Sequence, residues 1–183
     1  MTRLKNPIQS IFPIIVYLPH HPIIRESQTT ILRVVFNGSS ITSNGTSIND
    51  HMHIGPKLQL DLLSIVSQWR LYSFVLLADI AKMYRQILVD PRDRDYQRIF
   101  WRESSELKIE EFQLNTFTYG TRSAPYLALR VLQQLVKDEG NNFPAASLVI
   151  QHDTFVDDLV FGEHNLKDAL KVRNEVIDLL QKA

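Results

Sequence analysis

The sequence predicts an α+β fold in which an antiparallel sheet of three or four strands is backed by helices. A nearly continuous apolar run at residues 72–78 is consistent with a central strand buried on both faces, and it ends abruptly at Asp79. A second run, residues 154–161, places Asp157 and Asp158 between two short apolar stretches, as in a hairpin. Segments with helical periodicity lie between and after these runs. The 183 residues suit one domain, or the compact part of a larger one.

The first half of the chain predicts an extended arm, a strand and a helix. Prolines punctuate residues 11–24, which excludes a helix there. Residues 29–36 are rich in β-formers and end at the turn signal Asn37-Gly38. A polar loop follows, and the apolar residues within 58–69 then fall on one helical face.

The second half predicts short helical turns, a pair of strands and three longer helices, each from its periodicity or its end signals. These elements are helical turns at 81–87 and from Pro91, paired strands at 96–101 and 109–116, a helix from Ser123 to about residue 137 with Gly140 just past its end, a short helix from residues 143–144, and a last helix capped by Asn165.

The composition excludes several classes of site. Cysteine is absent, so the chain has no disulfide, no cysteine-based zinc site and no thiol nucleophile. No stretch approaches the roughly 20 apolar residues of a membrane span. The polar residues 1–10 are unlike a signal peptide. The sequence therefore predicts no membrane partner.

The formal net charge is zero, but the charges are unevenly distributed. Residues 1–102 hold 12 Lys and Arg against 7 Asp and Glu, whereas residues 103–183 hold 8 against 13. This asymmetry would suit a polyanion bound by the basic part and metal-bound carboxylates in the acidic part. It is also common on ordinary protein surfaces.

The adjacent carboxylates Asp157 and Asp158 would point to opposite faces of a continuous strand, but a tight hairpin can aim both into the same space. Two unit charges about 4 Å apart repel by about 4 kcal/mol at an effective dielectric constant near 20. Such a pair in apolar surroundings needs a raised pKa or a cation between the two groups. The alternative is a polar hairpin turn without further function.

Two further sites carry chemistry. A charge at Asp79, directly after an apolar strand, is costly unless the carboxylate caps the helical turn at 81–87 or binds a cation, and both alternatives stay open. Residues 119–125 form a glycine turn followed by a helix opening. Its free backbone N–H groups and Arg122 could meet a phosphate or a base pair.

Taken together, Asp79, residues 120–125 and residues 155–158 resemble the three central palm motifs of reverse transcriptases. The match is closest to the polymerases of Pao/BEL-type LTR retrotransposons, and it runs in order from about residue 14 to residue 162. The matching strings are Tyr17-Leu18-Pro19-His20-His21-Pro22, Leu32-Arg33-Val34-Val35-Phe36, Gly55-Pro56 with Leu58-Gln59, Ala78-Asp79-Ile80 with Lys82-Met83-Tyr84-Arg85-Gln86, Thr118-Tyr119-Gly120-Thr121 with Ser123-Ala124-Pro125, and Phe155-Val156-Asp157-Asp158-Leu159.

The resemblance implies an RNA-directed DNA polymerase that uses two Mg²⁺ ions about 4 Å apart, with Mn²⁺ as a possible substitute. Asp79 and Asp157 would bridge the ions, Asp158 would assist them, and the Ile80 carbonyl would contribute one more oxygen ligand. Phe155 stands where retroviral enzymes usually have Tyr. The packing ring is therefore kept without its hydroxyl, and Phe155 and Val156 complete the hairpin motif.

The same resemblance implies a nucleotide site. Arg33 would hold the triphosphate, and Tyr84 would lie under the incoming sugar and exclude a 2′-hydroxyl. Tyr119 and Gly120 would line the pocket, although retroviral enzymes carry Gln at the position of Tyr119. Asn37 replaces an expected Asp, which affects the local contact of that strand rather than the metal site.

The resemblance also implies a right-hand polymerase palm with an N-terminal fingers portion. Residues 1–70 and 85–115 would be fingers-like, and residues 71–84 and 116–183 would form the palm. The thumb and RNase H regions of a larger polyprotein would lie beyond Ala183. The expected partners are an RNA or DNA template–primer and deoxynucleoside triphosphates, and the expected location is the cytoplasm, including retrotransposon particles.

Two alternative functions stay open at this point. One is an inactive retrotransposon-derived remnant that at most binds nucleic acid. The other is an unrelated two-metal phosphohydrolase that uses the same carboxylates.

Overall fold

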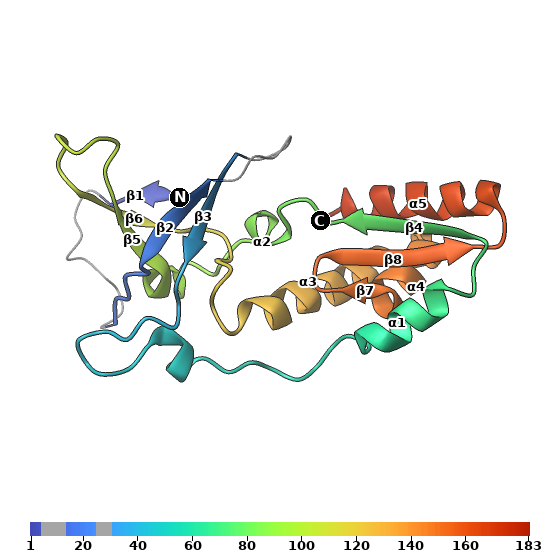
Figure 1. Ribbon diagram of the computed structural model, residues 1–183, viewed down its shortest axis with the longest axis horizontal. Coiled ribbons are helices and arrows are strands. Elements are labelled where there is room, and N and C mark those ends of the chain that lie inside the picture. The colour runs from blue at the N-terminus through green and yellow to red at the C-terminus, as the bar shows by residue number, and fades with distance from the viewer. Residues whose placement is uncertain (5–13, 25–30) are drawn as a thin grey trace. The chain divides into compact units, whose positions relative to one another are not determined.

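The computed structural model describes residues 1–4, 14–24 and 31–183. Helices and antiparallel strand pairs alternate along these residues, which confirms the predicted α+β class (Figure 1). The chain divides into two compact units. Unit 1 consists of Met1–Gly55 and Tyr84–Ala124, and unit 2 of Pro56–Met83 and Pro125–Ala183.

The boundaries of these units differ from the predicted polymerase subdomains at three places. Residues 56–70 belong to unit 2, whereas residue 84 and residues 116–124 belong to unit 1. The assignment of the units to fingers and palm stays a prediction.

Unit 1 contains a three-stranded sheet and a hairpin. In the sheet, β6 (Glu110–Gln113) pairs with both β1 (Thr2–Arg3) and β5 (Arg98–Trp101). In the hairpin, β2 (His20–Ile24) pairs with β3 (Leu32–Phe36). The end of the predicted arm is thus extended, as expected, and forms a strand. Parts of the predicted arm and strand, residues 11–13 and 29–30, lie outside the described residues.

The core of unit 1 joins the arm to the sheet. Leu18, Ile48 and Ile99 are buried together, and the main chain of Val16 and Leu18 exchanges hydrogen bonds with Arg98. The side chains packed against them are Val16, Phe36, Met52, Tyr96, Phe112 and Leu114. Three short helices complete the unit: η1 (Ile48–His51), η2 (Arg94–Gln97) and α2 (Met83–Gln86), which begins at the unit boundary.

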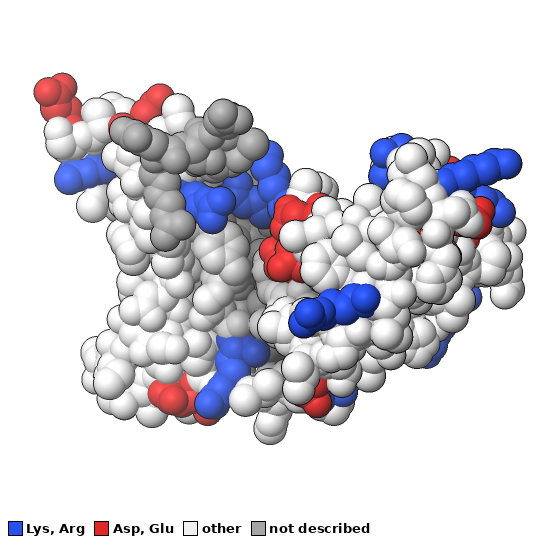
Figure 2. All heavy atoms as spheres, turned by 45° about the vertical axis from the view of Figure 1, so that its right-hand side comes forward, with Lys and Arg blue, Asp and Glu red and all other residues white. Residues whose placement is uncertain are grey.

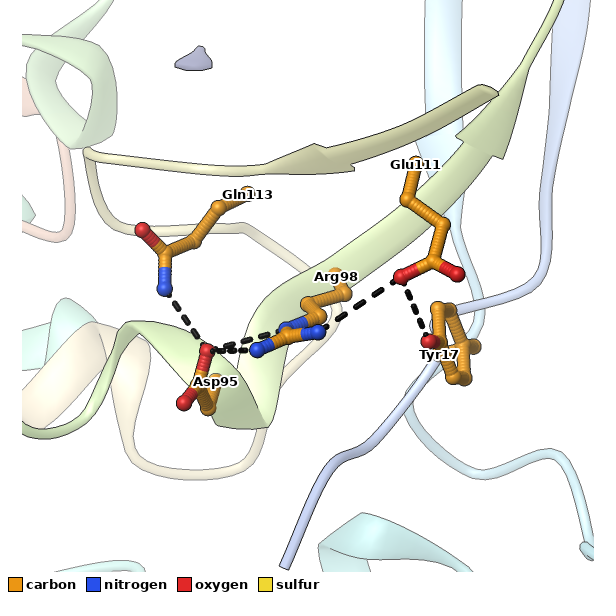
Figure 3. A network of polar contacts seen from close by, with 5 residues as sticks. All are labelled: Tyr17, Asp95, Arg98, Glu111 and Gln113. Atoms are coloured by element: carbon orange, nitrogen blue, oxygen red, sulfur yellow. Dashed lines mark hydrogen bonds and ion pairs between the residues drawn. The ribbon is translucent and has the colours of Figure 1, made fainter. Parts of the chain in front are cut away.

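A buried polar network ties the arm to β5 and β6 (Figure 3). The Arg98 side chain, 3% exposed, donates from Nε and Nη2 to Asp95 Oδ1 at 2.9 and 2.6 Å, and its Nη1 lies 3.5 Å from Glu111 Oε2. Gln113 also donates to Asp95, and the Tyr17 hydroxyl donates to Glu111 at 2.8 Å. Burial and the bond to Glu111 raise the pKa of the Tyr17 hydroxyl. Every member therefore has a charged or polar partner, which buried charges require.

Unit 2 is a three-stranded antiparallel sheet with helices packed on it. The strand order is β4 (Phe74–Asp79), β8 (Asp158–Glu163) and β7 (Thr154–Phe155). Figure 1 shows α5 behind β4 and α4 behind β8, and both helices contact the sheet. The helices of this unit are α1 (Leu62–Trp69), α3 (Ala124–Glu139, which starts at the boundary), α4 (Pro144–His152) and α5 (Leu166–Leu180), with the 3₁₀ turn η3 (Gly140–Asn142).

The prediction that residues 72–78 form a central strand buried on both faces is wrong. Within the described residues β4 pairs only with β8, and Val75 and Leu77 are 42% and 68% exposed. The central strand is β8, whose residues 159–162 are all buried. The reason is that β8 has a strand on each side and contacts α1, α4 and α5, whereas of these helices β4 closely contacts only α5.

Three helix predictions are confirmed, because the residues that start a helix act on its own first turn and can be recognised in the local sequence. The predicted helices beginning at Ser123, at residues 143–144 and after Asn165 are confirmed as α3, α4 and α5, and Asn165 Oδ1 accepts from the Asp168 N–H at 2.9 Å. The helix predicted for 58–69 starts only at Leu62. Its two earliest residues contact distant segments instead: the Leu58 carbonyl accepts from Gln133 Nε2 at 3.5 Å, and Gln59 Oε1 accepts from the Val156 N–H at 3.0 Å.

Asp153 follows α4 directly, and burial raises the pKa of its carboxyl. A carboxylate beside a helix C-terminus is also unfavourable by about 0.3–1 kcal/mol. The pKa of Asp153 is thus higher in the folded chain than in the unfolded chain. Its contribution to stability is therefore fully present below the unfolded pKa, and it is lost as the pH rises through the folded pKa. We therefore expect Asp153→Asn to stabilise unit 2 by about 0.5 kcal/mol at pH 7. The gain should vanish near pH 3 in denaturant titrations, and an equal gain at both pH values would contradict this account.

On the face drawn in Figure 2, the Lys and Arg side chains form several separate groups with neutral surface between them. Among the described residues, no helix combines the length and apolar character that crossing a membrane requires.

Candidate active site

The sheet of unit 2 sets Asp79 and Asp158 directly opposite each other. They are the last cross-strand partners of the β4–β8 ladder, and both are exposed. Cross-strand partners point to the same face, with Cβ atoms about 4.5–5.5 Å apart. Alternation along β4 places Asp79 on the face that also carries Val75 and Leu77, the open face of this strand.

Asp157 lies in the two-residue turn that joins β7 to β8. Phe155 pairs with Asp158, so the turn consists of Val156 and Asp157. Val156 has φ 59°, whereas Asp157 has no positive φ, a combination typical of a type II′ hairpin turn. A β-branched residue in the left-handed region costs roughly 1–2 kcal/mol. The turn therefore needs support from its surroundings.

Two hydrogen bonds from distant segments support this turn. The Ile80 N–H donates to the Asp157 carbonyl at 2.8 Å, which fastens the turn to the end of β4. The Val156 N–H donates to Gln59 Oε1 at 3.0 Å. The three predicted carboxylates and Ile80 thus lie at one end of one sheet, and Phe155 and Val156 complete that hairpin.

The donor set of this sheet end is all oxygen, which suits Mg²⁺. Within the described ranges, no three or more His, Asp or Glu residues are grouped so that they alone could hold a metal ion. Mg²⁺ is commonly held by one or two carboxylates together with substrate phosphates and waters. The paired carboxylates Asp79 and Asp158, with the adjacent Asp157, fit that mode.

Unit 1 brings together Arg33, Tyr119 and Gly120. The Tyr119 hydroxyl donates to the Val34 carbonyl, next to the exposed Arg33 on β3. Gly120 has φ 91°, and a Cβ there would collide with the Phe36 carbonyl. The glycine is therefore required both for its backbone conformation and for the close approach of β3.

Asn49 fixes the turn that contains Gly120. Its Nδ2 donates to the Gly120 carbonyl at 3.0 Å, and its Oδ1 accepts from the Arg122 N–H at 2.8 Å. The Arg122 side chain returns to the Asn49 carbonyl at 3.3 Å. The Arg122 amide N–H is thus engaged within the protein, whereas its exposed guanidinium uses only Nη1 in this contact, and its expected role toward a phosphate stays a prediction.

Tyr84 lies on the short helix α2 in unit 1 and is half-buried. The predicted site residues therefore form one set in unit 2, described above, and a second set in unit 1, namely Arg33, Tyr84, Tyr119 and Gly120.

Among solved structures, this chain is similar in fold to foamy virus protease–reverse transcriptases. The foamy viral protease–reverse transcriptase dRH in complex with double-stranded DNA matches 91% of this chain and 25% of its own, with a TM-score of 0.66 and 18% identity. The fold is reverse-transcriptase-like. The native prototype foamy virus protease–reverse transcriptase and its CSH mutant match with TM-scores of 0.64 and 0.67, each at 13% identity over 91% of this chain and 19% of theirs.

The chain spans about a fifth to a quarter of the length of these reverse transcriptases. No family model and no curated protein matches the sequence. The comparisons therefore establish the fold, and the Pao/BEL resemblance stays a prediction.

Gln59 and Asn49 carried no assigned role in the sequence. Asn49 lay in a polar loop, and Gln59 was one letter of a matching string. Their partners are 97 and 71 residues away along the chain. A local pattern contains no signal for such contacts. The role of each side-chain amide is visible only in the folded structure, where it hydrogen-bonds to the main chain of a turn.

Proposed function

We propose that this chain is the fingers and palm part of an RNA-directed DNA polymerase of the Pao/BEL retrotransposon type. The observation that carries the proposal is the cross-strand pair of Asp79 and Asp158 beside the Asp157 turn. Like charges directly opposite each other destabilise a strand pair. A sheet that ends in this arrangement is suited to binding a cation. The reverse-transcriptase-like fold supports the proposal that this cation serves a polymerase reaction.

In this proposal Asp79 and Asp157 hold two divalent cations, Asp158 assists from the facing strand, and the Ile80 carbonyl adds one oxygen. Bound Mg²⁺ would supply charge neutralisation at the transferred phosphoryl group and a lower pKa for the primer hydroxyl. The work of the chain is to hold these oxygens at a fixed spacing. The β4–β8 register and the two hydrogen bonds to the turn serve that purpose.

The residues of unit 1 would select the nucleotide. Arg33 would bind the triphosphate, and the Tyr119–Gly120 turn, fastened to β3, would line the pocket beside it. Tyr84 would face C2′ of the sugar and reject a ribonucleotide by steric exclusion. The partners are then a template–primer duplex and deoxynucleoside triphosphates.

The proposal is tested with the 183-residue chain in excess over a labelled primer–template, at low salt with Mg²⁺, and with one nucleotide at a time. We expect slow addition of the nucleotide complementary to the next template base, and little multi-nucleotide extension. Duplex is held mainly through many phosphate contacts, and this chain matches only a fifth to a quarter of the foamy virus chains. Equal addition of all four nucleotides, or none at any protein concentration, would favour an inactive remnant.

A further inference from the structure

We propose that Gln59 is a positioning residue that holds the Val156–Asp157 turn in its observed conformation, at the end of the sheet where Asp79 and Asp158 are paired. The inference rests on the proposed function, because it assigns Gln59 to the metal site of that polymerase. Gln59 does not touch the metal or the substrate in this account. It acts only through the main chain of the turn.

The turn has an intrinsic reason to leave this conformation. Val156 occupies the left-handed region at φ 59°, which a β-branched residue adopts only when its surroundings require it. Glycine is the usual residue at the first position of a type II′ turn. The sequence of the turn therefore does not select the turn type, and the selection comes from contacts made by other segments.

Two main-chain groups of the turn are held from outside. The Asp157 carbonyl accepts from the Ile80 N–H at 2.8 Å, and the Val156 N–H donates to Gln59 Oε1 at 3.0 Å. The first bond comes from the end of β4. The second comes from the segment before α1, and its acceptor is a half-buried side chain. Together they hold both ends of the Val156–Asp157 pair.

Loss of the Gln59 acceptor would free one side of this arrangement. The half-buried Val156 N–H would have to find water, and Val156 could relax to a negative φ. That change rotates the peptide between Val156 and Asp157 and displaces the Asp157 carboxylate. Asp158 is held by its strand register and would stay opposite Asp79.

The test uses three variants of the 183-residue chain. Gln59→Met keeps the length of the side chain and removes the acceptor, and Gln59→Glu keeps an acceptor oxygen. Gln134→Met is the matched control, because Gln134 is an exposed glutamine on α3 of the same unit. Thermal unfolding confirms that each variant folds before the other measurements are made.

Two readouts separate the positioning role from the metal site. The first is amide hydrogen exchange at Val156, measured by NMR without metal. We expect it to be about tenfold faster in Gln59→Met, near wild type in Gln59→Glu, and unchanged in Gln134→Met. The second is Mn²⁺ affinity, measured by broadening of the Asp157 and Asp158 amide signals. We expect Gln59→Met to bind about tenfold more weakly, at the low end of the effect of outer-shell partners.

Each other outcome has a definite meaning. Unchanged Val156 exchange in Gln59→Met overturns the inference, whatever the metal affinity. Faster exchange with unaltered Mn²⁺ affinity also overturns it, since the turn would then not matter to the site. If the wild-type chain shows no Mn²⁺ broadening at Asp157 and Asp158, the proposed function fails together with this inference. The Mn²⁺ affinity of Gln59→Glu is not compared, because its added charge would itself attract a cation.

Discussion

Replacement of Asp157 by Asn is expected to abolish Mg²⁺-dependent nucleotide addition while leaving the fold intact. The substitution keeps the size of the side chain and its place in the β7–β8 turn, but it removes the charge that would hold a cation. Metal activation of this kind supplies several kcal/mol, so the expected loss of rate is about a thousandfold. Single-turnover addition of one complementary nucleotide measures it.

The matched control for this substitution is Asp178→Asn. Asp178 is an exposed carboxylate on α5, within the same unit and outside both the β4–β8 ladder and the β7–β8 turn. It should leave both the rate and the thermal midpoint unchanged. A rate loss of less than tenfold for Asp157→Asn, with the control unaffected, would remove Asp157 from the proposed metal site.

The second large effect is expected at Arg98, whose guanidinium joins the carboxylates of Asp95 and Glu111 in unit 1. Arg98→Met would fill similar space but leave two largely buried carboxylates without their cation. Breaking a buried ion pair in this way typically costs about 3–5 kcal/mol. Gln113 and Tyr17 would still donate to the two carboxylates, so we expect about 3 kcal/mol in the free energy of unfolding, measured in denaturant at pH 7.

The pH dependence of this variant supplies an independent check. Without Arg98, two largely buried carboxylates would lose the cation between them, so their negative charges would oppose folding at neutral pH. The deficit should therefore shrink in acid, where carboxylates become neutral. Arg92→Met is the control, because Arg92 forms an exposed pair with Asp90 and should show no measurable change. A deficit for Arg98→Met as small as that of the control would mean that the network contributes nothing beyond a surface pair.

Helices with local end signals could be predicted from the sequence, and their packing partners could not. Asn165 caps α5 through a hydrogen bond that spans three residues, so the cap is visible in the local string. The Tyr17–Glu111 bond spans 94 residues, and no local string contains it. The polar network of unit 1 could therefore not be predicted from the sequence, because it joins segments that are far apart along the chain.

The exchange of roles between β4 and β8 shows why an apolar run does not identify a central strand. Residues 72–78 are more continuously apolar than residues 158–163, yet β8 is the strand with a partner on each side. Centrality depends on how many neighbours a strand acquires. An apolar run indicates only that the strand will be partly buried. For β4, contact with α5 and pairing with β8 supply that burial.

The carboxylates of the candidate site were predicted because charges at the ends of apolar strands are conspicuous. The register that sets Asp79 opposite Asp158 follows from pairing two segments 79 residues apart, which periodicity alone cannot specify. The amides of Gln59 and Asn49 are polar residues in loops, where polar residues are ordinary. Their roles depend on turns that exist only after long-range folding.

The interleaved make-up of the two units has a consequence for the order in which the chain can fold during synthesis. Each unit is completed by a segment that the ribosome produces after part of the other unit. Strand β4 is made early, and β8 must follow after 79 more residues before the two can pair. At a synthesis rate of about 5–20 residues per second, β4 waits for roughly 4–16 seconds. During that interval its apolar residues have no sheet partner, so its unpaired edge is open to non-native association until β8 has been made.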